Sequence, residues 1–137
     1  MQHWQHFQHD ADIGIRGYGK SLNDAFAQTA IALLAAITEP EQVQPRTAVP
    51  INCHADDVEL LLVEWLNALI YEMSVRAMLF ARFDVEIRGN TLTATAWGEG
   101  IDIQRHQPAV EPKGATLTEL KVAETKQGWL AQCVIDV

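Results

Sequence analysis

The first third of the chain changes from alternating hydrophobicity to helical spacing. Apolar and polar residues alternate on both sides of a polar turn at residues 9–12, which predicts two short strands. Apolar residues then recur at helical spacing over residues 22–37. Ser21, with Asp24 three positions later, is typical of a helix N-terminus. Glu39-Pro40 is expected to end this helix, because proline cannot continue it.

The middle of the chain predicts a strand and a second helix. The segment that contains Pro45 and Pro50 is expected to connect the first helix to a strand at residues 49–53. A second capping pattern, Asp56 followed by Glu59, predicts a helix that runs to about Arg76. Its apolar side chains cover most of the circumference, so it is expected to be largely buried against a sheet. One polar stripe remains, formed by Glu64, Asn67, Tyr71 and Ser74.

The last third of the chain is predicted to form two hairpins, separated by a polar stretch at residues 98–112. Arg88-Gly89-Asn90, whose residues tolerate positive φ, and Lys126-Gln127-Gly128 provide the two turns. The four strands are expected near residues 80–87, 92–97, 115–124 and 129–137.

The complete pattern predicts an α+β fold, with two helices packed on a largely antiparallel sheet of about seven strands. A chain of 137 residues, 48% of them hydrophobic, is long enough to bury one sizeable core. No repeat, low-complexity run or internal linker divides the chain. We therefore expect a single domain over residues 1–137.

The composition limits the classes of partner. The chain carries 10 Lys and Arg against 18 Asp and Glu, a formal net charge of -8, and contains no basic cluster. Direct binding of nucleic acid, which requires several phosphates to be neutralised, is not expected. A basic protein partner or a cation suits this charge, although acidity also serves solubility, and composition leaves these alternatives open.

Neither membrane insertion nor secretion is expected. The apolar runs are shorter than the ~18 residues that a membrane span needs. The start of the chain, Met1-Gln2-His3-Trp4-Gln5-His6, lacks the basic and apolar regions of a signal peptide. The expected location is therefore the cytoplasm. Cys53 and Cys133 are too few for a disulfide framework and lack zinc-site spacing, so both are expected to be core thiols.

The sequence contains no recognisable catalytic apparatus. Nucleophile motifs, glycine-rich phosphate loops and metalloprotease motifs are all missing, so we do not expect an enzyme. His3, His6 and His9 are spaced by three, but on a strand His6 points away from the other two. A metal site formed by three histidines is therefore not expected.

Two carboxylates are more informative. Asp12 lies in the predicted turn between the first two strands, and Asp136 lies beside Val137 in the last strand. If the turn lies next to that strand, the two carboxylates and the terminal carboxylate offer several oxygens to a hard cation. The alternative is that Asp12 stabilises its own turn and that Asp136 is only solvated. The spacing alone leaves both interpretations open.

Several motifs resemble the archease family. The run His9-x-Ala11-Asp12-Ile13-Gly14-Ile15, followed by Gly19-Lys20-Ser21-Leu22, is similar to the opening signature of this family. Further matching motifs follow in archease order and extend the resemblance over essentially the full length. They are Ala96-Trp97-Gly98-Glu99, Arg105-His106, Gly128-Trp129 and Val134-Ile135-Asp136-Val137.

The resemblance implies a function and a site. Archeases are accessory proteins of the RNA-splicing ligase RtcB, which joins an RNA 3′-phosphate or 2′,3′-cyclic phosphate end to a 5′-hydroxyl with GTP. They promote guanylylation and multiple turnover of RtcB in tRNA splicing and RNA repair. The family also has a divalent-metal site, commonly described with calcium, which corresponds here to Asp12, Asp136 and Val137. A chaperone or adaptor for RNA-modifying enzymes is an alternative function, and a small metal-dependent hydrolase is another.

Two segments depart from the archease pattern. Asp10 stands where relatives usually carry Thr, and adds a carboxylate either to the cation site or only to the turn. Lys113-Gly114-Ala115-Thr116-Leu117-Thr118 stands where relatives carry K-A-V-T-Y-H. The missing Tyr and His mean that a contact between this strand and the ligase is not expected to follow the family pattern.

Overall fold

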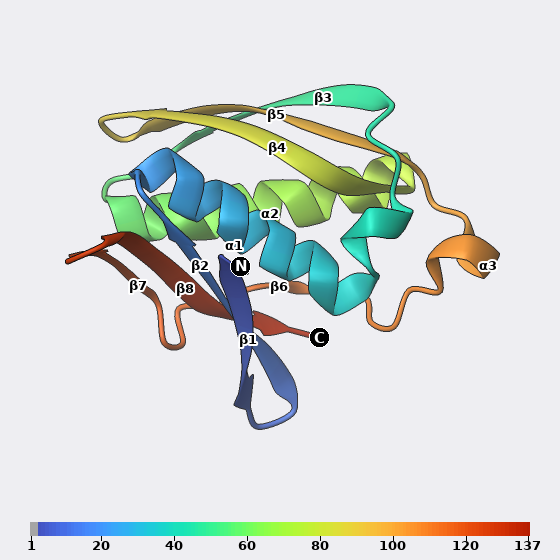
Figure 1. Ribbon diagram of the computed structural model, residues 1–137, viewed down its shortest axis with the longest axis horizontal. Helices are drawn as coiled ribbons and strands as arrows, with labels where there is room; N and C mark the ends of the chain where they lie inside the picture. The colour runs from blue at the N-terminus through green and yellow to red at the C-terminus, as the bar shows by residue number, and fades with distance from the viewer. Residues whose placement is uncertain (1–2) are drawn as a thin grey trace.

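The computed structural model describes residues 3–137 and consists of two antiparallel sheets with two helices between them (Figure 1). The larger sheet contains β1 (Trp4–His9), β2 (Asp12–Gly19), β8 (Gly128–Asp136), β6 (Gly114–Ala115) and β7 (Lys121–Thr125). The smaller sheet contains β3 (Thr47–His54), β5 (Thr91–Gly100) and β4 (Met78–Arg88). The helices between them are α1 (Leu22–Ile37) and α2 (Val58–Arg76), and the short helices are η1 (Pro40–Gln42) and α3 (Ile103–His106).

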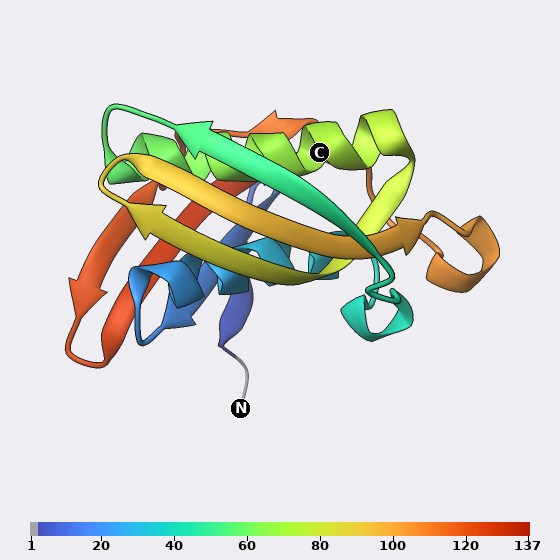
Figure 2. The ribbon, with the colours of Figure 1, turned by 90° about the horizontal axis from the view of Figure 1, so that it is seen from above.

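The α+β prediction is confirmed, but a sheet covers the helical layer on each side, and residues 3–137 contain eight strands. Figure 2 shows the smaller sheet lying across both helices. The reason is visible in α1, where Ala25 and Ala32 are fully buried on one side of the helix and Leu34 is fully buried on the opposite side. A helix that is apolar over most of its circumference needs cover on more than one side.

The caps define where the two long helices begin. The Ser21 hydroxyl accepts a hydrogen bond from the Asp24 N–H at 3.1 Å, as the sequence predicted. The cap of α2 is Asp57, not Asp56: its carboxylate accepts a hydrogen bond from the Leu60 N–H at 2.8 Å. The predicted start was therefore one residue too early, because both aspartates precede the same apolar run.

The two helices and the larger sheet approach each other closely. The Trp65 indole N–H on α2 donates to the main-chain oxygen of Phe26 on α1 at 3.1 Å. A side chain at Gly17 of β2 would collide with main-chain atoms of Ala25 and Thr29 in α1. The absence of a side chain at this position therefore lets the helix lie directly on the strand.

The strand predicted at residues 115–124 is interrupted. Ala115 pairs with Ile135, and Lys121 pairs with Gln132. The five residues 116–120 therefore lie opposite only two residues of β8, 133 and 134, and bulge from the sheet. Two side chains of α2 cover the outer edge on either side of this bulge. Asn67 accepts from the Ala115 N–H at 2.8 Å, and Glu59 accepts from the Val122 N–H at 3.2 Å. The long-range bonds to α2 explain why local hydrophobicity did not reveal the break.

No helix within residues 3–137 is long and apolar enough to cross a membrane. The expectation of a missing signal peptide rests partly on Met1 and Gln2, which lie outside the described residues.

Both cysteines are buried free thiols, as predicted. Burial raises the pKa of Cys53 to about 11, with the negative charge of Glu64 adding to the effect. Burial also raises the pKa of Cys133 to about 12. Since the thiolate is the reactive form, we expect neither thiol of the native protein to react readily with Ellman's reagent at neutral pH. Both should react once denaturant is added, and rapid labelling of either thiol in the native protein would contradict the prediction.

Candidate functional site

Antiparallel pairing of β2 with β8 brings the two predicted carboxylates together. Ile13 pairs with Ile135, and this register, continued by one residue, sets Asp12 opposite Asp136. The Asp12 carboxylate accepts a hydrogen bond from the main-chain N–H of Val137 at 3.3 Å. We call Asp10, Asp12, Asp136 and Val137 the acidic tip.

The turn that carries Asp12 depends on its neighbour Asp10. His9 pairs with Asp12, so only Asp10 and Ala11 form the connection between β1 and β2. Asp10 has a φ of 53°, a left-handed conformation that aspartate adopts more readily than most residues. Its side chain is 93% exposed and lies 3.9 Å from the His9 imidazole. Asp10 therefore shapes the turn and adds negative charge at the surface.

The other side of the acidic tip is held by the segment before β6. The Lys113 N–H donates to the main-chain oxygen of Asp136 at 2.8 Å, and Gly114 pairs with Asp136 in the sheet. The end of β8 is thus held between β2 and β6, while the Asp136 side chain is exposed.

The donors of the acidic tip fit a hard cation in their chemistry. Asp12, Asp136 and the main-chain oxygen of Val137 provide only oxygen ligands, which calcium and magnesium prefer. Within residues 3–137, no group of three His, Cys, Asp or Glu side chains is arranged to hold a metal. Further ligands would therefore come from water or from a partner. The hydrogen bond of Asp12 reaches Val137 and not its own turn, which weighs against a purely turn-stabilising role.

The three histidines are not brought together. His6 lies against the ring of Trp4, with ring centroids 5.0 Å apart, and its Nε2 is 2.8 Å from the main-chain oxygen of Ala32 in α1. His9 lies on the opposite face of β1, because strand side chains alternate. The prediction that His6 points away from His9 is confirmed, whereas His3 lies before the strand.

A second charged cluster surrounds Glu99, at the end of β5. Its Oε2 atom accepts hydrogen bonds from Arg105 Nη1 at 2.8 Å, the Gln44 N–H at 2.8 Å and His106 Nε2 at 3.1 Å. His106 Nδ1 accepts from the Asp102 N–H at 2.9 Å, which assigns the imidazole proton to Nε2. The sequence contained one signal of this cluster, the charged residues Glu99 and Arg105 in the polar stretch at residues 98–112. The hydrogen bond from the distant Gln44 N–H could not be predicted.

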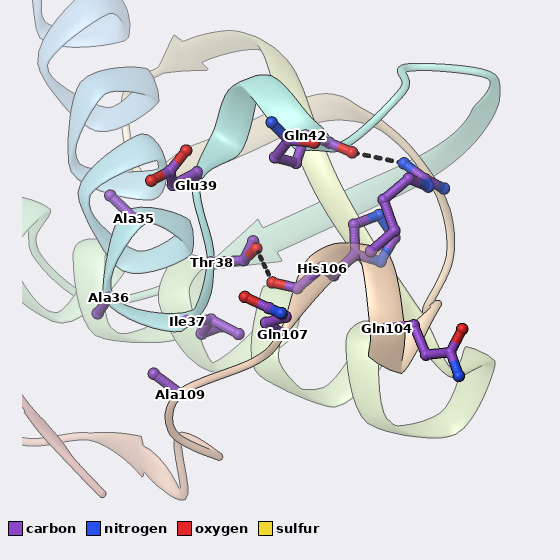
Figure 3. Close-up of a pocket in the computed structure, with 11 residues that line it drawn as sticks. Ala35, Ala36, Ile37, Thr38, Glu39, Gln42, Gln104, His106, Gln107 and Ala109 are labelled. Carbon is purple, nitrogen blue, oxygen red and sulfur yellow. Dashed lines mark hydrogen bonds between the residues drawn. The ribbon is translucent and has the colours of Figure 1, made fainter.

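The Glu99 cluster fastens α3 to the rest of the protein. Arg105 also donates to the main-chain oxygen of Gln42 at 2.6 Å, and Thr38 donates to the main-chain oxygen of His106 at 2.6 Å (Figure 3). These bonds join α3 to η1 and to the end of α1. A hollow of about 520 Å³ lies beside them, with Gln104 on its rim. Because each charge is satisfied internally, the cluster acts as a structural clasp.

Comparison with known proteins identifies the family. Residues 4–137 match the Archease protein family (MTH1598/TM1083). The chain belongs to the archease family. It is 37% identical to the protein archease of Pyrococcus abyssi and 34% identical to that of Pyrococcus furiosus, in both cases over 100% of each chain. The archease resemblance of the sequence motifs is thereby confirmed.

Two solved structures share the archease fold. The solution structure of Protein 1598 of Methanobacterium thermoautotrophicum has a TM-score of 0.88 and 27% identity, over 100% of both chains. The crystal structure of an archease, "possible chaperone", from Thermotoga maritima has a TM-score of 0.61 and 20% identity, over 96% of this chain and 94% of that one.

Replacing Glu99 tests the clasp. Three hydrogen bonds, with the one from Arg105 contributing most, followed by that from the Gln44 N–H, lower the pKa of Glu99 from 4.5 to about 2. The stabilisation by this carboxylate is therefore complete above its unfolded pKa near 4.5 and is lost as pH falls towards 2. We expect Glu99→Gln to be less stable than the wild type at neutral pH, with a difference that shrinks across this acidic range.

Urea unfolding measured as a function of pH gives this difference directly. Glu124→Gln, at an exposed position of β7, is the matched control and should show no comparable dependence. A Glu99→Gln deficit that stays constant from neutral to acidic pH would contradict the role of the ionised carboxylate.

Proposed function

We propose that this archease is a non-catalytic, cytosolic accessory factor of the RNA ligase RtcB, and that it promotes guanylylation and multiple turnover of the ligase. The observation that carries the proposal is the convergence of Asp12 and Asp136 at the ends of the adjacent strands β2 and β8, where Asp12 accepts a hydrogen bond from Val137. Carboxylates from distant parts of the chain, gathered where a partner can reach them, suit a role in assisting a partner's site.

The acidic tip is also proposed to bind a divalent metal ion, with calcium the first candidate. Asp12, Asp136 and the oxygen of Val137 would hold it. A bound cation supplies positive charge that stabilises a transferring phosphate. The tip has room for ligands from the ligase, since its own side chains provide only part of a coordination shell.

Electrostatics supports association with a nucleic-acid enzyme. An RNA ligase presents a basic surface to its substrate, whereas this chain carries a formal net charge of -8. Opposite charges accelerate the encounter of two proteins and lose their effect as salt rises. We expect stimulation of the ligase to weaken in high salt.

The acidic tip is tested in a ligation assay with RNA in excess over RtcB of the same organism. The intact protein should raise the number of turnovers, whereas Asp12→Ala and Asp136→Ala should each reduce the stimulation by about tenfold or more, as expected for loss of a metal-site residue. Asp136 is exposed and Asp12 is half-buried, and circular dichroism checks that each variant remains folded.

Glu124→Ala is the matched control, since it removes one exposed carboxylate at the far end of β8, where Glu124 pairs with Trp129. It should stimulate the ligase like the wild type. Full stimulation by both tip variants would show that the acidic tip is not the active element. No stimulation by the intact protein would contradict the accessory function itself.

Metal binding is tested without the ligase. Calcium that binds the folded protein and not the unfolded chain raises the melting temperature by mass action. We therefore expect a calcium-dependent rise for the wild type and for Glu124→Ala, and little or none for Asp12→Ala. Equal rises in all three proteins would place calcium elsewhere, and a titration with magnesium compares the two hard cations.

A chaperone function is the second candidate, because large apolar side chains are exposed. Tyr71 is 63% exposed and Ile103 is 64% exposed. A general chaperone would suppress aggregation of unrelated proteins, and Asp12→Ala would leave that activity unchanged. Activity that depends on RtcB and on Asp12 favours the specific accessory role.

A further inference from the structure

A large groove runs between α2 and the connector from β5 to β6. It has a volume of about 1080 Å³ and is lined mainly by apolar side chains, including Ile70 and Met73 of α2 and Val110 of the connector. Its polar lining consists of Asn67, Ser74, Glu111 and Lys113. The surface is therefore an open apolar channel with charged residues towards one end.

Within residues 3–137, three of the six exposed large hydrophobic residues line this groove, while Leu60 and Leu117 lie elsewhere. Tyr71, Ile101 and Ile103 all line it and all remain exposed, Ile101 to 38%. Val75 follows Tyr71 by one helical turn and is 59% exposed. Exposed apolar side chains that lie together along a groove mark surfaces that bind another protein.

The walls of the groove are held in place before any partner arrives. One wall is a regular helix, α2. The other wall is the connector, which is held by main-chain hydrogen bonds. At its start the Ile101 N–H donates to the Ala77 oxygen at 2.9 Å, and further along the Ala109 N–H donates to the Ile37 oxygen at 2.8 Å. The Glu99 clasp fixes α3 between these points. Figure 1 shows α3 and the connector at the end of the helical layer. A preformed groove loses little entropy on binding.

The groove continues to the acidic tip. Its last lining residue, Lys113, donates its N–H to the main-chain oxygen of Asp136 at 2.8 Å. Glu111, Asp12 and Asp136 leave this end with an excess of negative charge over Lys113. An occupant therefore meets apolar side chains along the groove and carboxylates at one end.

We propose that the groove binds an amphipathic segment of RtcB, whose apolar side chains enter the groove and whose Lys or Arg residues lie against the carboxylate of Glu111. The inference rests on the proposed function, for which it specifies the docking surface. Segments of this type bind grooves through apolar anchors at regular spacing. Docking there sets the acidic tip at a constant distance from the ligase, so the groove determines affinity and the tip determines stimulation.

The test separates these two roles by titrating each archease variant into the multiple-turnover ligation assay. Tyr71→Ala and Ile103→Asn should each raise the concentration needed for half-maximal stimulation by about tenfold, while stimulation at saturation stays unchanged. Glu111→Lys should raise this concentration in the same way, because the new lysine repels the basic residues of the segment. Each of these side chains is exposed at the surface, so the fold is expected to persist.

Leu60→Ala is the matched control, since Leu60 is an exposed apolar residue of α2, 38% exposed, that does not line the groove. It should behave like the wild type in the titration. Asp12→Ala should show the contrasting pattern. The maximal stimulation of the ligase should be lost, while the affinity for the ligase should change little.

Each remaining outcome counts against one proposal only. Wild-type titration curves for Tyr71→Ala, Ile103→Asn and Glu111→Lys would overturn the groove and leave the accessory function intact. Absence of stimulation by the wild type, combined with binding to RtcB that Tyr71→Ala and Ile103→Asn weaken, would overturn the function and retain the groove. A monomer–dimer equilibrium that these variants alter, without any effect on the ligase, would assign the groove to a second copy of this chain and overturn the proposal.

Discussion

The antiparallel pairing of β2 with β8 is the constraint on which the rest of the structure depends. It joins the beginning of the chain to its last strand, with Ile13 opposite Ile135, and thereby creates the acidic tip. The pairing is stabilised from the helical layer, because Gly17 lets α1 lie directly on β2 and Thr29 donates to the main-chain oxygen of Ala131 in β8 at 3.2 Å. Loss of this pairing would separate Asp12 from Asp136 and remove the surface on which α1 packs.

The location of the helices follows from their composition. Burial on two sides requires apolar residues around most of the circumference, and leaves few positions for polar side chains. In α2 those positions are used for specific bonds: Glu59 and Asn67 accept from the edge formed by β6 and β7. Asn67 of the polar stripe, together with Glu59, therefore covers a sheet edge that would otherwise expose unpaired N–H groups. Tyr71, on the same stripe but beyond the edge, remains available to the groove.

Local patterns predicted most of the fold, and long-range pairings produced the differences. Ser21 and the run of apolar residues after it define α1 without help from the rest of the chain. The break between β6 and β7 depends on hydrogen bonds to α2, which no local window contains. The same holds for the candidate site: Asp12 and Asp136 were recognisable as carboxylates in a turn and at a strand end, but their adjacency is a property of the sheet. Glu99 and Arg105 stood in two of the matching motifs, but the bond from the Gln44 N–H to Glu99 could not be predicted, because Gln44 lies far away in the sequence.

The clasp, the groove and the acidic tip share a single structural element, the connector from β5 to β6. The clasp uses its charges internally: Glu99 is neutralised by Arg105, so this ion pair adds little attraction for a distant partner. The long-range field must then come from exposed carboxylates, including those of the acidic tip. Since Lys113 N–H donates to Asp136 oxygen, a displacement of the connector by an occupant of the groove would be transmitted directly to the end of β8. Rigid attachment at the clasp limits such displacement, which favours an acidic tip presented in one position over one that is adjusted by binding.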